Sequence, residues 1–333
     1  MNENQTTAAP AALSAPKARA YTVRDTFGLT SAPPTAVIAG LEPGLANVPP
    51  ANQHYVFEED TLRQLHMFWA SGNRALLIEG DPSAGKTSLF EQFHARLNVP
   101  LYKVACSPST ETYHLIGQYV PREDGHGLRW VDGPVVRACR EGTSVLLDEG
   151  NTLDPGVATG MNMLLEGYSW TIPETGETIM PARTTRFFMT QNAVDSKVMV
   201  AGRQVQDAAF DDRWSYMRVT YLRPELEEEL IVKYLSNGKV PPEVVQNTAK
   251  IVVAVANKVR EAFRNDAPGI DKPLSTRVLM RWAMYTLMYT GPMRAKRKSA
   301  LHYAVNQAVP MSRDMAAALQ EQITLVAGYG PDL

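Results

Sequence analysis

A loop bracketed by two glycines is the first stretch whose residue spacing points to specific chemistry. Residues 80–87 read GDPSAGKT and fit G-x-x-x-x-G-K-[ST] at every fixed position. In such a loop, backbone N–H groups turn inward around phosphate oxygens, and the helix that follows adds partial positive charge behind them. Lys86 is then expected to contact the β- and γ-phosphates of a nucleotide, and the Thr87 hydroxyl to contact Mg²⁺. The residues expected to bind the nucleotide are Gly80, Asp81, Pro82, Ser83, Ala84, Gly85, Lys86, Thr87 and Ser88.

The alternative for this loop is a chance glycine turn without function. An apolar run precedes the loop, and a helical pattern follows from Lys86. That order of strand, loop and helix is the context in which the pattern binds phosphate, so it favours the functional interpretation.

Two adjacent carboxylates end a second apolar run. Residues 144–149 read SVLLDE, and Asp148 lies 62 residues after Lys86. Parallel α/β sheets collect ligand groups at the carboxyl edge of their strands. Asp148 suits Mg²⁺ coordination there, directly or through water, and Glu149 can orient and deprotonate the water that attacks the γ-phosphate. A nucleotide kinase, which hands the phosphate to an acceptor, needs no glutamate to activate water, so the pair favours hydrolysis. Without the phosphate loop, the same pair would indicate only a strand that meets solvent.

Three more polar residues lie where a nucleotide could be contacted. Asn192 follows an apolar run and can hold the attacking water or the γ-phosphate, although it could equally cap a turn. Arg213 precedes the last expected strand, on the far side of the core from the loop. It therefore suits the nucleotide of a neighbouring subunit, and a local salt bridge with adjacent acids is the alternative. Arg277 lies in the first turn of a helix, where a cation gains nothing from the helix dipole, so an anionic ligand would explain it.

The elements that must position these residues are apolar runs that alternate with helical patterns, which is typical of strand-helix-strand units. They predict an α/β fold with a five-stranded parallel sheet between layers of helices. The expected strands cover residues 75–79, 101–105, 144–147, 186–190 and 216–221.

The chain divides into three parts. Residues 1–52 hold 12 Ala and 7 Pro with little periodicity, which predicts a flexible arm, and compact structure is expected from about His54. Within that arm, residues 21–29 (YTVRDTFGL) form either a docking segment or a local turn. Residues 53–223 carry the expected strands and the nucleotide motifs. Residues 224–333 carry only helical patterns, which predicts a smaller all-helical lid domain.

Composition excludes several classes of protein. The chain has 333 residues, with 33 basic and 35 acidic side chains, so bulk electrostatics disfavour a nucleic-acid partner. Two cysteines, Cys106 and Cys139, are too few for a disulfide framework or a cysteine zinc site. The start lacks the pattern of a signal peptide, and no run of 18 apolar residues is present. A cytoplasmic protein with no membrane partner is therefore expected.

The order of the motifs GDPSAGKT, LLDEGN, MTQN, DDRW and LSTR resembles the AAA+ ATPases. Within them it is similar to the MoxR group, close to the CobS-type ATPase subunit of aerobic cobaltochelatase, over about residues 53–290. The resemblance implies Walker A and Walker B motifs, ATP and Mg²⁺ as cofactors, and a homo-oligomeric ring, most simply a hexamer. It assigns Asn192 to sensor 1, Arg213 to the arginine finger and Arg277 to sensor 2.

Two hairpins also follow from the resemblance. MoxR-like proteins carry one hairpin ahead of the second acidic motif, which matches residues 116–133, and one ahead of the sensor strand, which matches residues 169–181. In the second segment, Gly176 between strand-like residues indicates a turn independently of any resemblance.

The expected function is Mg²⁺-dependent ATP hydrolysis by a ring that remodels or activates a partner protein complex. The resemblance implies a client with a von Willebrand A domain. Two alternatives stay open: an ATPase subunit that drives cobalt insertion into a corrin precursor, and a nucleotide-gated assembly scaffold with little turnover. The joint presence of Glu149, Asn192 and Arg213 argues against the scaffold. The near-neutral charge argues against a DNA translocase.

Overall fold

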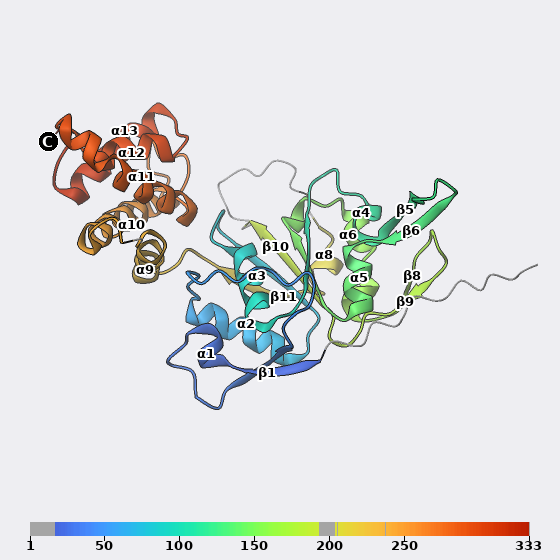
Figure 1. The fold of residues 1–333 in the computed structure, drawn as a ribbon. Helices are drawn as coiled ribbons and strands as arrows, with labels where there is room; N and C mark the ends of the chain where they lie inside the picture. The colour runs from blue at the N-terminus through green and yellow to red at the C-terminus, as the bar shows by residue number, and fades with distance from the viewer. Residues whose placement is uncertain (1–16, 193–203, 205, 237, 333) are drawn as a thin grey trace, which may run out of the picture.

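A five-stranded parallel sheet lies at the centre of the core (Figure 1). The computed structural model describes residues 17–192, 204, 206–236 and 238–332. The strand order is β11-β3-β10-β7-β4, which confirms the expected α/β fold. The last strand ends at Val219, so Tyr221 lies beyond the sheet and not within it as expected. The strands are β3 (Ala75–Gly80), β4 (Leu101–Ala105), β7 (Ser144–Asp148), β10 (Arg186–Asn192) and β11 (Ser215–Val219).

Alternate residues of each strand pack into two different layers, as the period of a β-strand requires. In β3, Leu76 and Ile78 pack with one set of helices, and Ala75 and Leu77 pack with the other. The first layer contains α1 (Val23–Phe27), α2 (Glu59–Ser71) and α3 (Lys86–Leu97). The second contains α4 (Thr112–Ile116), α5 (Pro134–Glu141), α6 (Pro155–Thr159), α7 (Asn162–Glu166) and α8 (Ala208–Asp211).

One glycine lets two strands approach closely beside the phosphate loop. Gly80 is paired with Val219 in the parallel β3–β11 ladder. A Cβ atom on Gly80 would lie 1.9 Å from the Val219 carbonyl oxygen, closer than any side chain can sit. The glycine at the start of the loop therefore also brings residues 220–223, which lead out of the sheet, alongside the loop.

The segment around residues 21–29 packs on the core of its own chain. Strand β1 (Ala18–Thr22) pairs antiparallel with β2 (Val37–Leu41), and α1 lies between them in sequence. The Phe27 ring lies 5.2 Å from the Phe57 ring and 5.6 Å from the Phe93 ring. Ordered structure thus starts well before His54, contrary to the expectation. The expected flexible arm can apply only to residues 1–16, which lie outside the described residues.

Two antiparallel hairpins lie side by side at the end of the core away from the lid in Figure 1. The first is β5 (Gly117–Pro121) with β6 (Leu128–Asp132), and the second is β8 (Trp170–Thr171) with β9 (Thr178–Ile179). The Tyr119 hydroxyl of the first donates a hydrogen bond of 3.2 Å to the Glu174 carbonyl of the second. Both expected hairpins are therefore present, and they contact each other.

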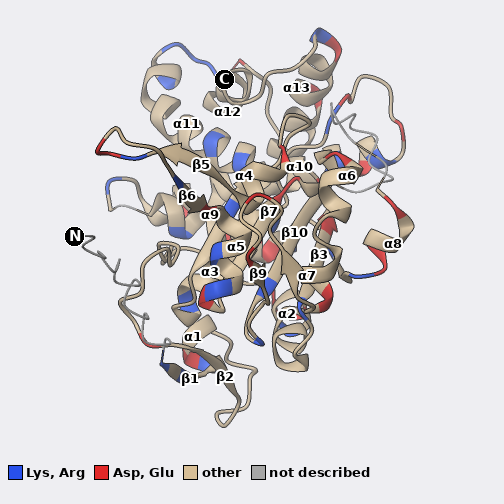
Figure 2. Ribbon diagram, turned by 90° about the vertical axis from the view of Figure 1, so that its right-hand side faces the viewer, with Lys and Arg blue, Asp and Glu red and all other residues tan. Residues whose placement is uncertain are grey.

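Helices alone form the C-terminal part, as expected, around a core that includes the fully buried Trp282. Acidic and basic residues are interspersed over this part and over the sheet domain (Figure 2). No helix in the described part of the chain has the length and apolar character needed to cross a membrane. The helices are α9 (Pro224–Leu235), α10 (Pro242–Arg264), α11 (Thr276–Ala295), α12 (Ala300–Ala308) and α13 (Arg313–Ala327).

A buried histidine makes the stability of the sheet domain sensitive to acid. His94 on α3 is 0% exposed, shares a 2.7 Å hydrogen bond between its Nδ1 and the Phe90 carbonyl, and has no partner for Nε2 among the described residues. Burial lowers the pKa of His94 to about 4 from its usual value of 6.5. Protonation below pH 6.5 therefore favours the unfolded chain.

We expect the free energy of unfolding to fall by on the order of 3 kcal/mol between pH 7 and pH 4 through this one group. Urea midpoints measured across that range should fall toward acid more steeply for wild type than for His94→Leu, because the variant lacks the titrating ring. His126→Leu, which removes an exposed turn histidine, should keep the wild-type pH dependence. Parallel curves for wild type and His94→Leu would contradict this assignment.

Candidate functional site

The loop between β3 and α3 has the backbone of a phosphate cradle. Ser83 and Gly85 adopt left-handed conformations, with φ of 56° and 89°. Glycine accepts that conformation freely, whereas a serine there is strained and is held by its surroundings, as is common at functional sites. Gly85 caps α3 in this conformation, so the first N–H groups of the helix lie at the loop.

Lys86 is fixed inside this loop. Its side chain is largely buried, and Nζ donates to the Gly80 carbonyl at 2.9 Å, the Asp81 carbonyl at 2.8 Å and Asn192 Oδ1 at 3.0 Å. Burial lowers the pKa of Lys86 to about 8, against the opposing effect of nearby carboxylates such as Asp81. The three acceptors are neutral, so a phosphate would be a stronger partner for the ammonium group. Asn192 and Lys86 were both expected beside the phosphates, and the hydrogen bond between them brings the two side chains together.

Asp148 lies at the carboxyl end of β7 and accepts two hydroxyl hydrogen bonds through Oδ1. Thr87 Oγ1 donates at 2.7 Å and Thr190 Oγ1 at 2.5 Å. A carboxylate beside a hydroxyl, next to a phosphate loop, is the donor set with which proteins hold Mg²⁺ together with nucleotide phosphates. Asp148 and Thr87 therefore fit the expected metal, which would neutralise charge on the β- and γ-phosphates. Thr190 was not foreseen, although it lies in the same MTQN run as Asn192.

Glu149 is held with its carboxylate exposed. Its backbone is left-handed, with φ of 58°, and its N–H donates to Thr190 Oγ1 at 3.1 Å. The side chain is exposed to solvent, in contrast to the buried apolar residues that precede it in β7. An accessible carboxylate one residue after Asp148, the expected metal ligand, can accept a proton from a water molecule at the γ-phosphate.

Replacing Glu149 by Gln should lower ATP turnover by two to three orders of magnitude while ATP still binds, because the amide keeps the shape of the side chain but cannot accept the proton. Phosphate release and nucleotide affinity measured on the same preparation separate the two effects. Glu141→Gln, which alters an exposed acid at the end of α5, serves as the control and should turn over normally. Loss of ATP binding in Glu149→Gln would show that this residue is structural.

Arg213 lies at the amino-terminal ends of the strands, whereas the phosphate loop lies at their carboxyl-terminal ends. It precedes β11, whose Ser215 pairs with Leu76 near the start of β3, and its Nε lies 2.5 Å from Glu166 Oε1 at the end of α7. The phosphate loop follows the other end of β3, about 20 Å away at the rise of a β-strand. The local ion pair is thus with Glu166 and not with the adjacent acids, and Arg213 cannot reach the loop of its own subunit.

Arg277 is exposed in the first turn of α11, one residue after Thr276. Arg260 of the lid and Tyr221, in the segment between β11 and α9, were not singled out from the sequence, yet they form a chain of contacts to the loop. Arg260 stacks on the Tyr221 ring, and Tyr221 in turn contacts Pro82 of the loop. The Tyr221–Pro82 contact joins residues 139 positions apart in the sequence, so no local pattern marks it.

A cavity next to the loop offers space for the rest of a nucleotide. Its apolar lining suits the flat base of a nucleotide, and Ala84 and Gly85 of the loop are part of that lining. The lining comes from the segment before α2, from the loop and α3, and from the segment after β11, and includes Tyr55, Val56, Gly85, Leu89, Tyr221 and Leu222.

Comparison with known families agrees with this geometry. Residues 75–214 match the AAA domain of the dynein-related subfamily, and residues 239–326 match the CbbQ/NirQ/NorQ C-terminal family. The chain therefore carries an AAA domain followed by a CbbQ/NirQ/NorQ C-terminal domain, the combination of MoxR-type ATPases. The AAA match covers β3 through Arg213, and the second match covers the lid helices α10 to α13 except the last residue of α13.

Individual relatives of this ATPase differ greatly in length. The aerobic cobaltochelatase subunit CobS of Sinorhizobium sp is 26% identical over 78% of each chain. Midasin of Giardia intestinalis is 33% identical over 46% of this chain, and midasin of Dictyostelium discoideum is 27% identical over 69%. The chain spans only 3% and 4% of the two midasins, so the activities of those whole proteins do not transfer to it.

Proposed function

We propose that this AAA+ ATPase works as a homo-oligomeric ring, most simply a hexamer, which uses Mg²⁺-dependent ATP hydrolysis to remodel or activate a partner protein complex. In this proposal Lys86 and the loop bind the phosphates, Thr87 and Asp148 hold Mg²⁺, and Glu149 activates water. Asn192 and Arg277 contact the γ-phosphate or the attacking water, and Arg213 acts on the nucleotide of the adjacent subunit.

The position of Arg213 is the observation that supports a ring most strongly. The β3–β11 register places Arg213 at the amino-terminal ends of the strands, whereas the phosphate loop of the same subunit follows the carboxyl-terminal end of β3. Arg213 therefore cannot act on the nucleotide of its own subunit. In a ring, identical subunits meet head to tail, so two different surfaces of the subunit face each other at every interface. In this proposal the surface around Arg213 faces the phosphate loop of the next subunit.

Assembly can be tested directly. Light scattering with ATP should report a single closed oligomer for Glu149→Gln, which binds nucleotide without turning it over. ATPase activity per wild-type subunit should rise with protein concentration until assembly is complete. Constant activity per subunit across concentrations at which light scattering reports only monomers would overturn the ring.

The client can be sought with the same variant. Glu149→Gln with ATP should retain clients on the assembled ring, and Lys86→Ala, which lacks nucleotide, serves as the matched control. Proteins enriched only with Glu149→Gln are candidate clients, and the proposal expects a von Willebrand A domain among them.

A second candidate function follows from the relative of similar length. CobS is named as a subunit of aerobic cobaltochelatase and aligns with 78% of this chain. If this chain drives cobalt insertion into a corrin precursor, its ATPase rate should increase when a chelatase large subunit and a corrin substrate are added. An unchanged rate would leave only the broader proposal.

A further inference from the structure

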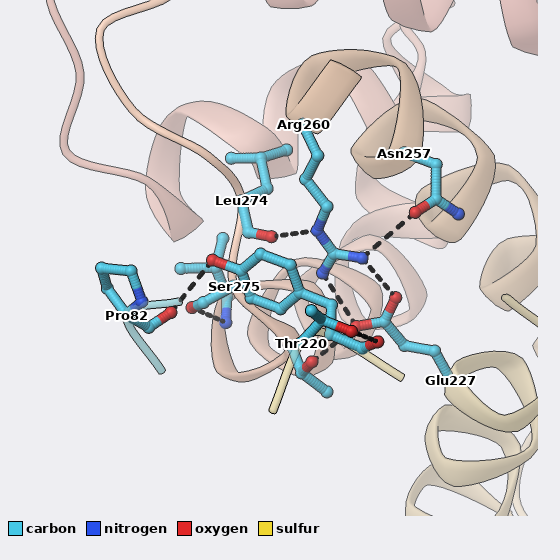
Figure 3. Close-up of polar contacts among 10 residues, drawn as sticks. Pro82, Thr220, Glu227, Asn257, Arg260, Leu274 and Ser275 are labelled. Atoms are coloured by element: carbon cyan, nitrogen blue, oxygen red, sulfur yellow. Dashed lines mark hydrogen bonds and ion pairs between the residues drawn. The ribbon is translucent and has the colours of Figure 1, made fainter. Parts of the chain in front are cut away.

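A buried ion pair stands out in the lid domain (Figure 3). Arg260 on α10 and Glu227 on α9 are 2% and 0% exposed, and their side chains make two parallel contacts of 2.8 Å and 2.9 Å. Removing two charges from water is costly and is tolerated only when the geometry and the remaining hydrogen bonds are satisfied. Such a pair is therefore rigid.

Further hydrogen bonds complete the pair and leave the guanidinium no freedom to turn. Arg260 Nε donates to the Leu274 carbonyl at 2.8 Å, and Nη1 donates to Asn257 Oδ1 at 3.2 Å. The Thr276 hydroxyl, at the start of α11, donates to Glu227 Oε1 at 2.5 Å. The cluster thus ties together α9, α10 and the start of α11, so it follows any movement of the lid as a unit.

One aromatic side chain connects this cluster to the phosphate loop. Tyr221 lies in the segment that leads from β11 to α9, and the Arg260 Cζ lies 3.9 Å from its ring centroid. That is close enough for a cation–π contact. At the other end of the ring, the hydroxyl donates to the Pro82 carbonyl at 3.0 Å. Burial raises the pKa of Tyr221, so the hydroxyl stays protonated and remains a donor.

The hydrogen bond to the Pro82 carbonyl also fixes the direction of the Ser83 N–H group. A trans peptide unit is planar, with its C=O and N–H on opposite sides. When the Pro82 carbonyl points to Tyr221, the N–H of Ser83 must point away from it. Ser83 itself is held in a left-handed conformation, which indicates that this peptide is constrained. Inward-pointing N–H groups are what a phosphate loop offers to its ligand.

We propose that Tyr221 is a positioning residue that couples the lid to the phosphate loop. The Glu227–Arg260 pair holds its ring, and its hydroxyl holds the peptide whose Ser83 N–H binds a nucleotide phosphate. This inference rests on the proposed role of the loop and adds the contact through which lid and nucleotide influence each other. Because coupling is reciprocal, phosphate binding favours the lid position that keeps Arg260 on the ring.

The hydroxyl is tested by Tyr221→Phe, which keeps the ring and its stacking. We expect the ATP dissociation constant to rise about fivefold, the usual effect of one lost hydrogen bond, while turnover at saturating ATP changes less than twofold. Hydrogen exchange should become faster at the amides of residues 82–85 and stay unchanged elsewhere in the core. Tyr102→Phe, on the edge strand β4, removes a similar hydroxyl, which contacts Glu141 at the end of α5, and should change neither quantity.

The lid arm of the coupling is tested by a paired replacement, Glu227→Leu with Arg260→Met, which leaves no unpaired buried charge. The paired replacement should also weaken ATP binding about fivefold, because it releases the aromatic ring of Tyr221. In a protein that already carries Tyr221→Leu, it should weaken ATP binding no further, because both changes act through Tyr221. Additive effects would overturn the coupling. If the paired variant does not fold, the Tyr221→Phe result decides alone.

The outcomes also separate this inference from the proposed function. Unchanged ATP affinity and loop exchange in Tyr221→Phe, in a protein whose ATP binding still requires Lys86, would overturn only the role of Tyr221. A wild-type protein whose ATP binding does not depend on Lys86 would overturn the loop assignment on which both rest.

Discussion

Arg213→Ala is expected to lower ATP turnover per subunit by about 10³, while each subunit still binds ATP and joins the ring. The reason is that a guanidinium from the adjacent subunit stabilises charge that develops on the γ-phosphate only in the transition state. Within its own subunit, Arg213 makes an ion pair with Glu166, and a partly exposed pair of this kind contributes under about 1 kcal/mol to stability. Steady-state phosphate release, with light scattering on the same samples, measures the effect.

An exposed arginine elsewhere in the sheet domain provides the control for this result. Arg63 on α2 pairs with Glu59 and Asp60 at the surface, so Arg63→Ala should leave turnover unchanged. If Arg213→Ala also turns over normally while rings form, then Arg213 contributes only its local ion pair.

Lys86→Ala is expected to abolish measurable ATP binding. The ammonium is buried against the carbonyls of the loop, and no other cation in the described part of the chain donates to them. Loss of the charge-assisted contacts to phosphate is therefore not compensated. Calorimetry of ATP binding measures the loss, and Lys103→Ala, which alters an ion-paired lysine on β4, should bind ATP as wild type does.

The pH dependence of binding gives an independent check on Lys86. Burial lowers its pKa to about 8 in the free protein, and a bound phosphate favours the charged form. ATP affinity of wild type should therefore begin to fall as the pH approaches 8 and decrease further above it, because the free protein loses the proton that the complex requires. Affinity that stays constant up to pH 10 would contradict the lowered pKa of Lys86 in the free protein.

The sequence alone predicts the parts of this molecule that depend on local order. The phosphate loop and the five core strands each follow from spacing or periodicity within a short window. The two hairpins were expected from the family resemblance, and only the turn at Gly176 in the second of them has a local signal of its own. The N-terminal segment was misjudged because its anchor is a distant contact: Phe27 is held by Phe57 and Phe93, which no pattern in residues 1–52 reveals.

The connection between lid and loop could not be foreseen for the same reason. Pro82, Tyr221 and Arg260 come from three separate segments, and each alone is an ordinary residue in its own stretch of sequence. A buried charge such as Glu227 stands out only when its exposure is known, since glutamate on a helix is usually solvated.

The central claim, that one subunit completes the active site of the next, is tested most directly by mixing two inactive variants. Arg213→Ala subunits keep the phosphate loop, and Lys86→Ala subunits keep the arginine. In mixed rings, some interfaces pair an intact loop with an intact Arg213 from the neighbour, so phosphate release should partly return and should peak near equal proportions. If subunits exchange, both variants form rings and no activity returns at any ratio, Arg213 does not act across the interface.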